Sequence, residues 1–137
     1  AGGILHYKDG RTAPDTINVL LEYPNDWTAT FEATLAPGIK GAAVEMCGTL
    51  GKLFITRSHF EFQSIEKGAP PVVVKSPRDQ TIDHVENFLD CCRTRKLPNG
   101  DVYIGHRSAA ASHLGNIAYL QRRRLRYNPD REEILPL

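Results

Sequence analysis

Hydrophobic and polar residues alternate along most of the first half of the chain. From Thr16 to Tyr23 and from Trp27 to Leu35, every second residue is apolar, which is typical of strands with one buried face. Pro24-Asn25-Asp26 lies between these stretches and favours a turn, so the pattern predicts a β-hairpin. The chain breaks at Pro37-Gly38, and five more short strands are predicted at residues 3–7, 43–47, 52–56, 59–63 and 71–75, with a turn at 48–51.

The second half of the chain changes to helical spacing. A first helix is predicted to begin at Ser76-Pro77, with Asp79 in its first turn, and to end near Arg95. Its apolar stripe consists of Ile82, Val85, Phe88, Leu89 and Cys92. After an extended link at residues 102–104, a second helix is predicted from about Arg107 to Arg122. Its buried residues are expected to be Ala110, Leu114, Ile117, Ala118 and Leu120.

A strand-rich half followed by two helices predicts an α+β fold rather than alternating βαβ units. We expect an open, mainly antiparallel β-sheet of about six strands with both helices packed on one face. The 137 residues match the common size of a single domain, so residues 1–137 are expected to share one hydrophobic core.

Composition narrows the class of protein. The formal net charge of +1 lacks the basic excess of general nucleic-acid binders, and no apolar run approaches the roughly 20 residues that span a bilayer. We therefore expect neither nucleic acid nor membrane as a partner. Three cysteines make no disulfide framework and the N-terminus does not resemble a signal peptide, which favours a cytoplasmic location.

The common catalytic motifs are missing from the sequence. No G-x-G-x-x-G turn is present, so we expect no NAD or NADP site in this chain, and no nucleophile elbow surrounds Ser108. His106 and His113 are seven residues apart on one helical face, but no acidic residue in that helix completes a metal site. The arginine-rich run at 122–126 is a basic cluster that could hold phosphate, but we favour a helix C-terminus, where cationic side chains offset the helix dipole. Catalytic, cofactor-binding and metal-binding residues are thus all expected to be absent.

Two longer segments and several short ones carry a family resemblance. Residues 84–101, followed by Gly105-His106-Arg107-Ser108 and then by residues 113–119, resemble the C-terminal signature of bacterial members of the glucose–fructose oxidoreductase, inositol dehydrogenase and MocA family. Residues 11–16, 22–24, 47–51 and 125–129 resemble the open-sheet domain of the same family, in the same order.

The resemblance implies a substrate-side and oligomerisation domain that follows a Rossmann domain absent from this chain. NAD or NADP and the catalytic residues would belong to that upstream domain, and the parent protein would oxidise or reduce a sugar or polyol. By analogy with the family, a sugar-like molecule is expected to contact Arg11, Asp15, His106, Arg107, His113 and Asn116. A homo-oligomer through the open sheet face, with Trp27, Phe31, Ala33 and Leu35 as apolar surface, is also expected.

Two other classes of function remain open from the sequence. One is a stand-alone binding or scaffold module without redox activity. The other is an enzyme with a hydrolytic or metal-dependent site around His106 and His113.

Overall fold

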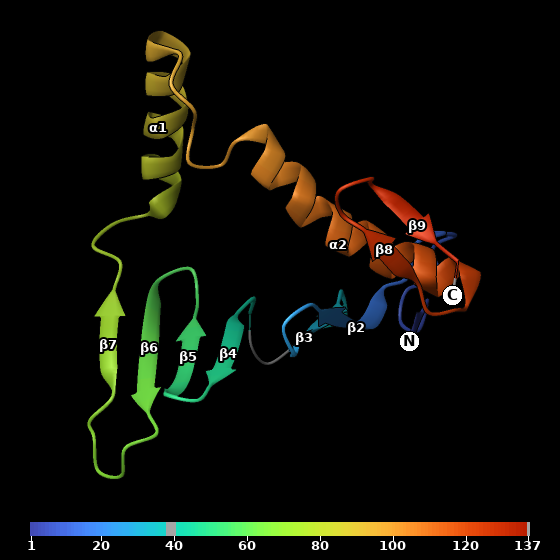
Figure 1. Ribbon diagram of the computed structural model, residues 1–137, viewed down its shortest axis with the longest axis horizontal. Helices are drawn as coiled ribbons and strands as arrows, with labels where there is room; N and C mark the ends of the chain where they lie inside the picture. Colours follow the sequence, from blue (N-terminus) through green and yellow to red (C-terminus); the bar gives the residue numbers. More distant parts are fainter. Residues whose placement is uncertain (38–40, 137) are drawn as a thin grey trace. The chain divides into compact units, whose positions relative to one another are not determined.

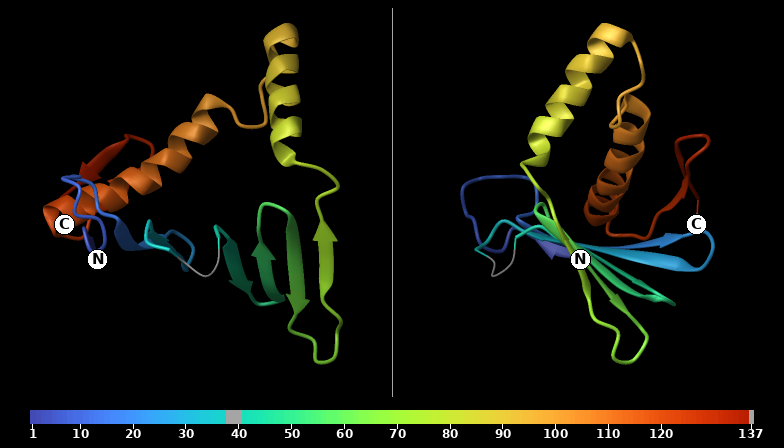
Figure 2. Two further views of the ribbon diagram at one scale, coloured as in Figure 1. Left: turned by 180° about the vertical axis from the view of Figure 1, so that it is seen from behind. Right: turned by 90° about the vertical axis from the view of Figure 1, so that its left-hand side faces the viewer.

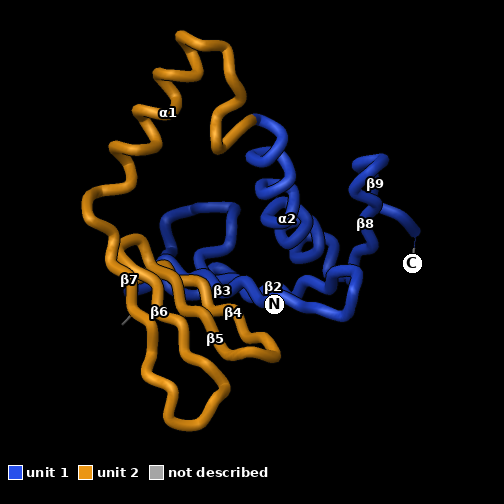
Figure 3. The backbone as a smooth tube through the Cα atoms, turned by 60° about the vertical axis from the view of Figure 1, so that its left-hand side comes forward, with its two compact units in different colours: residues 1–38, 102–137 blue, residues 39–101 orange. Residues whose placement is uncertain are grey.

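A computed structural model describes residues 1–37 and 41–136, so Gly38 of the predicted break lies outside the described residues. The described residues form nine strands and two helices, and all the strand pairs are antiparallel. The chain divides into two compact units, which Figure 3 colours separately. Unit 1 comprises Ala1–Gly38 and Val102–Leu137, and unit 2 comprises Ile39–Asp101. The predicted α+β class and antiparallel pairing are confirmed.

A three-stranded sheet forms the base of unit 1, with the order β1 (Gly2–Gly3), β2 (Thr16–Tyr23) and β3 (Trp27–Thr34). Val19 is opposite Phe31 and Tyr23 is opposite Trp27, so the apolar residues of both strands share one face, as expected for the hairpin. At its end, the Tyr23 and Trp27 rings stack 3.9 Å apart. Asn25 and Asp26 make the turn with positive φ values of 66° and 59°, which these residue types tolerate.

The first predicted strand, residues 3–7, is wrong beyond Gly3. In place of a neighbouring strand, the amide groups of Leu5, His6 and Tyr7 donate hydrogen bonds to the carboxylate of Asp15. Because these donors are already satisfied inside a loop, the chain leaves the sheet after β1.

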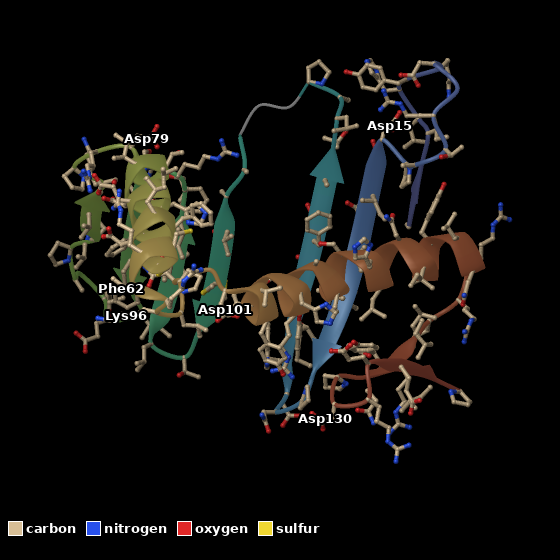
Figure 4. The ribbon with its side chains drawn as sticks, turned by 90° about the horizontal axis from the view of Figure 1, so that it is seen from above. Asp15, Phe62, Asp79, Lys96, Asp101 and Asp130 are labelled. Atoms are coloured by element: carbon tan, nitrogen blue, oxygen red, sulfur yellow. The ribbon has the colours of Figure 1, made fainter. Side chains whose placement is uncertain are left out.

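Helix α2 (Val102–Gln121) lies across the apolar face of β2 and β3, which Figure 4 shows from above. Of the residues predicted to be buried, Ala110, Leu114, Ile117 and Ala118 are half-buried, whereas Leu120 is 70% exposed. The predicted extended link at 102–104 is wrong, since these residues form the first turn of the helix. The β-branched and aromatic side chains of Val-Tyr-Ile favour strands only weakly, and context overrides such preferences.

A short hairpin, β8 (Arg126–Asn128) and β9 (Glu133–Leu135), completes unit 1. The Asn128 side-chain oxygen accepts from the amides of Asp130, 2.9 Å away, and Arg131, 3.1 Å away. These bonds form an Asx turn, and Figure 4 shows Asp130 at this turn beside α2. The sequence pattern did not predict β9.

Unit 2 contains a four-stranded sheet in the order β4 (Val44–Gly48), β5 (Gly51–Ile55), β6 (His59–Ser64) and β7 (Val72–Lys75). Figure 2 shows its twist. The predicted turn at 48–51 joins β4 to β5. Gly51 has a φ of 149°, and a Cβ atom there would lie 2.1 Å from the Gln63 carbonyl oxygen, so only glycine fits.

One face of this sheet is apolar at eight neighbouring positions. Cross-strand partners share a face, and the register aligns two apolar rows across all four strands. The rows are Val44, Ile55, Phe60 and Val74, and Met46, Leu53, Phe62 and Val72. The five most exposed of these eight side chains have exposed fractions from 38%, at Phe60, to 55%, at Met46. We call these eight residues the apolar face of unit 2.

Helix α1 (Gln80–Thr94) follows β7 in the chain (Figure 1). Its N-cap is Asp79, whose carboxylate accepts a hydrogen bond from the Thr81 amide at 2.8 Å. Ser76 does not cap the helix, because its hydroxyl donates to the Arg78 carbonyl. None of its residues is buried, and its predicted apolar stripe stays exposed, for example 57% at Phe88. Within the described residues, neither helix is long and apolar enough to cross a membrane.

Two further expectations need correction. The strands of residues 1–37 and 41–136 form sheets of three, four and two strands, nine strands in all, where about six were expected. No hydrophobic side chain among residues 1–37 and 41–136 is buried, whereas one core was expected. Even in unit 1, the apolar side chains of α2, β2 and β3 are half-buried or exposed. That the chain acts as one functional domain stays a prediction.

Candidate functional site

A groove of about 770 Å³ runs along α2 in unit 1, between β2 and the segment that forms β8 and its turn. Its apolar floor consists of Val19, Leu21, Ala110, Ala111 and Leu114. Small-molecule sites are typically concave, mostly apolar and about 300–1,000 Å³ in volume, with a few polar groups. The size and lining of this α2–β8 groove match that description.

The polar groups of the groove include one ion pair and one contact between a histidine and a carboxylate. His106 Nε2 on α2 lies 3.0 Å from Glu132 Oε1, which the β8–β9 turn supplies. At another point, Arg124 pairs with Glu22 of β2. His106 and Glu132 are about half exposed, at 52% and 53%, so both remain accessible to a ligand.

Two further arginines, Arg107 and Arg126, line the same groove. The guanidinium carbon of Arg107 lies 5.1 Å from the centre of the Tyr103 ring, a cation–π contact that restricts this long side chain. Arg126 begins β8 and is opposite Leu135 of β9. Neither guanidinium has an acidic partner among the described residues.

A second, smaller groove of about 310 Å³ lies between α2 and the β2–β3 face. Asp15 and Asn116, both predicted substrate contacts, line this groove together with Phe31 and Leu35. These two residues are therefore close to α2, but in a different hollow from His106 and Arg107.

The Asp15 carboxylate is held by the protein's own backbone. Its oxygens accept from the amides of Leu5 at 3.0 Å, His6 at 2.8 Å and Tyr7 at 2.8 Å, and the residue is only 2% exposed. The Leu5 amide, followed by those of Tyr7 and His6, lowers the pKa of Asp15 well below its ordinary value, which keeps the carboxylate ionised. Asp15 thus fixes the 4–15 loop, and Figure 4 shows it at the start of β2.

Arg11 lies on the same loop. Its Nε and Nη2 atoms donate to the two carboxylate oxygens of Asp9 at 2.8 and 2.6 Å, and its guanidinium carbon lies 4.4 Å from the centre of the Tyr7 ring. The hydrogen bonds from Arg11 lower the pKa of Asp9 to about 2. Arg11 lines a shallow hollow of about 380 Å³, which adjoins the smaller groove at Ala13, Pro14 and Leu35.

The six predicted contact residues therefore do not converge. His106 and Arg107 meet in the α2–β8 groove, Asp15 and Asn116 in the smaller groove, and Arg11 in the loop hollow. His113 is exposed on α2 and lines none of these three. Whether each contacts a substrate stays a prediction.

The sequence interpretation missed Glu132, Arg126 and Glu22 as members of the groove. For Glu132 and Arg126 a signal was available: Asn128-Pro129-Asp130 is turn chemistry, and a turn there folds the segments on either side into a hairpin. For Glu22, only the placement of α2 against β2 shows its role.

Metal ligands were considered around His106 and His113. A metal site in a protein usually combines three or four ligating side chains. Within residues 1–37 and 41–136, no group of three His, Cys, Asp or Glu residues could hold an ion. The carboxylate that contacts His106 is that of Glu132, which lies outside α2, in the β8–β9 turn.

Comparisons with protein-family models, with curated proteins and with solved structures gave no match to this chain. The resemblance to the glucose–fructose oxidoreductase, inositol dehydrogenase and MocA family therefore rests on the sequence segments alone.

Proposed function

We propose that this chain is the C-terminal, substrate-side and oligomerisation domain of an NAD(P)-dependent sugar or polyol oxidoreductase of the glucose–fructose oxidoreductase, inositol dehydrogenase and MocA family. Hydride transfer requires a cofactor held against the substrate with fixed geometry. In this proposal an upstream Rossmann domain binds NAD or NADP, and the present chain contributes one wall of the substrate site without being catalytic alone.

The observation that carries the proposal is the α2–β8 groove with His106 and Arg107 in it. Both residues belong to the segment that resembles the family signature, and both line a groove of ligand size. The His106 imidazole and the Glu132 carboxylate can donate to and accept from hydroxyl groups, which are the polar groups of a sugar or polyol.

The apolar face of unit 2 supports the oligomerisation half of the proposal. Eight apolar side chains lie side by side on one sheet face, and five of them are 38–55% exposed, which is the kind of continuous apolar surface that marks an interaction site. Two such sheets can pack face to face at about 10 Å, and a two-fold axis lets both copies use the same surface. We therefore propose that this face, rather than the Trp27–Leu35 face first expected, joins two copies.

Calorimetric titration of the purified chain tests the ligand half. We expect glucitol to bind in the millimolar range or better, His106→Ala to weaken that binding severalfold, and NADH to give no stoichiometric binding. His84→Ala removes an exposed imidazole from unit 2 and is the matched control. Absence of binding by any sugar or polyol, with or without an acidic group, would contradict the proposal, as would tight stoichiometric uptake of NADH.

A stand-alone binding or scaffold module is the second candidate, and the extent of exposed apolar surface favours it. Such a module would self-associate through the apolar face of unit 2 but would bind no sugar or polyol in the α2–β8 groove. The same titration therefore separates the two candidates.

A further inference from the structure

The α2–β8 groove carries an excess of positive charge. Three arginines and two glutamates line it, together with His106. Glu22 is paired with Arg124 and Glu132 with His106, so the two acidic side chains already have partners. With His106 counted as neutral, the three arginines and two glutamates give the groove a net charge of +1, and two of the arginines have no acidic partner in the described part of the chain. The whole chain carries a formal net charge of only +1, so this excess is concentrated locally.

The unmatched charges are those of Arg107 and Arg126. The Tyr103 ring orients the Arg107 guanidinium but carries no counter-charge, and Arg126 has no acidic partner among the described residues. A guanidinium presents several donors in one plane and matches carboxylate and phosphate oxygens with two parallel hydrogen bonds. Two arginines in a groove with an apolar floor therefore favour an anionic ligand.

We propose that the α2–β8 groove binds a hydroxylated ligand that bears a carboxylate or phosphate group, with Arg107 and Arg126 holding the anion. This inference rests on the proposed function and narrows its substrate class from neutral sugars and polyols to sugar acids or sugar phosphates. The carbon skeleton lies on the floor formed by Val19, Leu21 and Leu114. The hydroxyl groups bond to His106 and Glu132.

Three related probes test the proposal by calorimetric titration of the full chain: glucitol, gluconate and glucitol 6-phosphate. They share a six-carbon polyol body, so differences in affinity report on the anion and show whether carboxylate or phosphate is preferred. We expect at least one anionic probe to bind tenfold or more tightly than glucitol, and added salt to reduce this preference.

Arginine variants locate the anion. Arg107→Gln and Arg126→Gln are each expected to weaken the anionic probe about tenfold and to leave glucitol nearly unchanged, and Arg→Lys variants should restore part of the affinity. Arg123→Gln removes the same charge from a residue outside this groove and is the matched control. Far-ultraviolet circular dichroism of each variant verifies that the fold is retained.

The outcomes separate the two proposals. Preference for an anionic probe that depends on Arg107 and Arg126 but not on Arg123 supports both. Equal binding of glucitol and both anions, insensitive to the arginines, overturns the anionic ligand but leaves the sugar or polyol domain standing. If none of the three probes binds, both proposals are overturned.

Discussion

Gly115 of α2 packs directly against Val19 of β2. A Cβ atom added to Gly115 would lie 2.9 Å from one methyl carbon of Val19 and 3.4 Å from the other. The helix backbone can approach the sheet this closely only because the residue has no side chain. Gly115 is also the only buried residue of α2, so this contact sets the spacing between helix and sheet that forms both grooves.

Replacing Gly115 with Leu should therefore destabilise unit 1. We expect a loss of about 1–3 kcal/mol in the free energy of unfolding, because a new side chain must push α2 away from β2. Urea denaturation followed by circular dichroism measures the change. Gly105→Leu is the matched control on the same helix: a Cβ atom there meets nothing within 4 Å, so helix propensity alone should stabilise by up to about 1 kcal/mol. Adding Val19→Ala to the Gly115→Leu variant makes room at the contact and should restore part of the lost stability. If the double variant recovers none of it, the packing argument is contradicted.

The Asp15 carboxylate predicts a pH dependence of stability. Its native pKa lies below the ordinary value of 3.8, mainly through the Leu5 amide. The stabilising contribution is therefore complete above about pH 5 and is lost as the pH falls through 3.8 toward the native pKa. Asp15→Asn should lower the thermal midpoint at pH 7 and should flatten its decline between pH 5 and pH 2.

Thermal denaturation at several pH values checks this prediction. Asp9→Asn is the control, because the pKa of Asp9 is also lowered, to about 2, but its side chain is 52% exposed beside Arg11. Solvent screens the Asp9 pair, so its removal should change the midpoint less. Identical pH profiles for wild type and Asp15→Asn would show that the three amide bonds do not stabilise the loop.

The C-terminus of α1 offers a stabilising substitution. Arg95 adopts a left-handed conformation with a φ of 60°, and its amide donates to the Cys91 carbonyl at 2.8 Å. Glycine adopts this conformation without steric cost, so Arg95→Gly should stabilise the helix end by up to about 1 kcal/mol. Arg93→Gly, within the helix, should reduce helicity instead. Ellipticity at 222 nm during heating compares the two variants, and equal loss of helicity in both would contradict the assigned cap.

The apolar face of unit 2 predicts self-association. Val74→Lys places a charge on that face and should convert a dimer to a monomer, weakening association at least tenfold, because burying an unpaired ammonium is costly. Val73→Lys changes the adjacent residue, whose side chain projects from the other face, and should leave the dimer intact. Size-exclusion chromatography with light scattering measures both. A wild-type chain that stays monomeric at high concentration would disprove the dimer.

Local patterns predicted most elements, since each depends on nearby residues. The alternation from Thr16 to Tyr23 predicted β2 with its observed bounds and identified the shared apolar face of the hairpin. The stripe at Ile82, Val85 and Leu89 predicted α1 from its helical spacing. The wrong predictions were a strand at residues 4–7 and an extended link at residues 102–104, where the local sequence pattern was weak or misleading.

The sequence by itself thus determined most of the secondary structure and the apolar faces, because a period of two or of 3.6 residues can be read directly from the order of apolar and polar side chains. Only the tertiary structure decided that Asp15 turns inward to three amides, that Glu132 reaches His106 across 26 residues, and that Arg107 and Arg126 line one groove. Such contacts join distant parts of the chain, and their formation depends on how helix and strands pack rather than on any residue's neighbours in sequence.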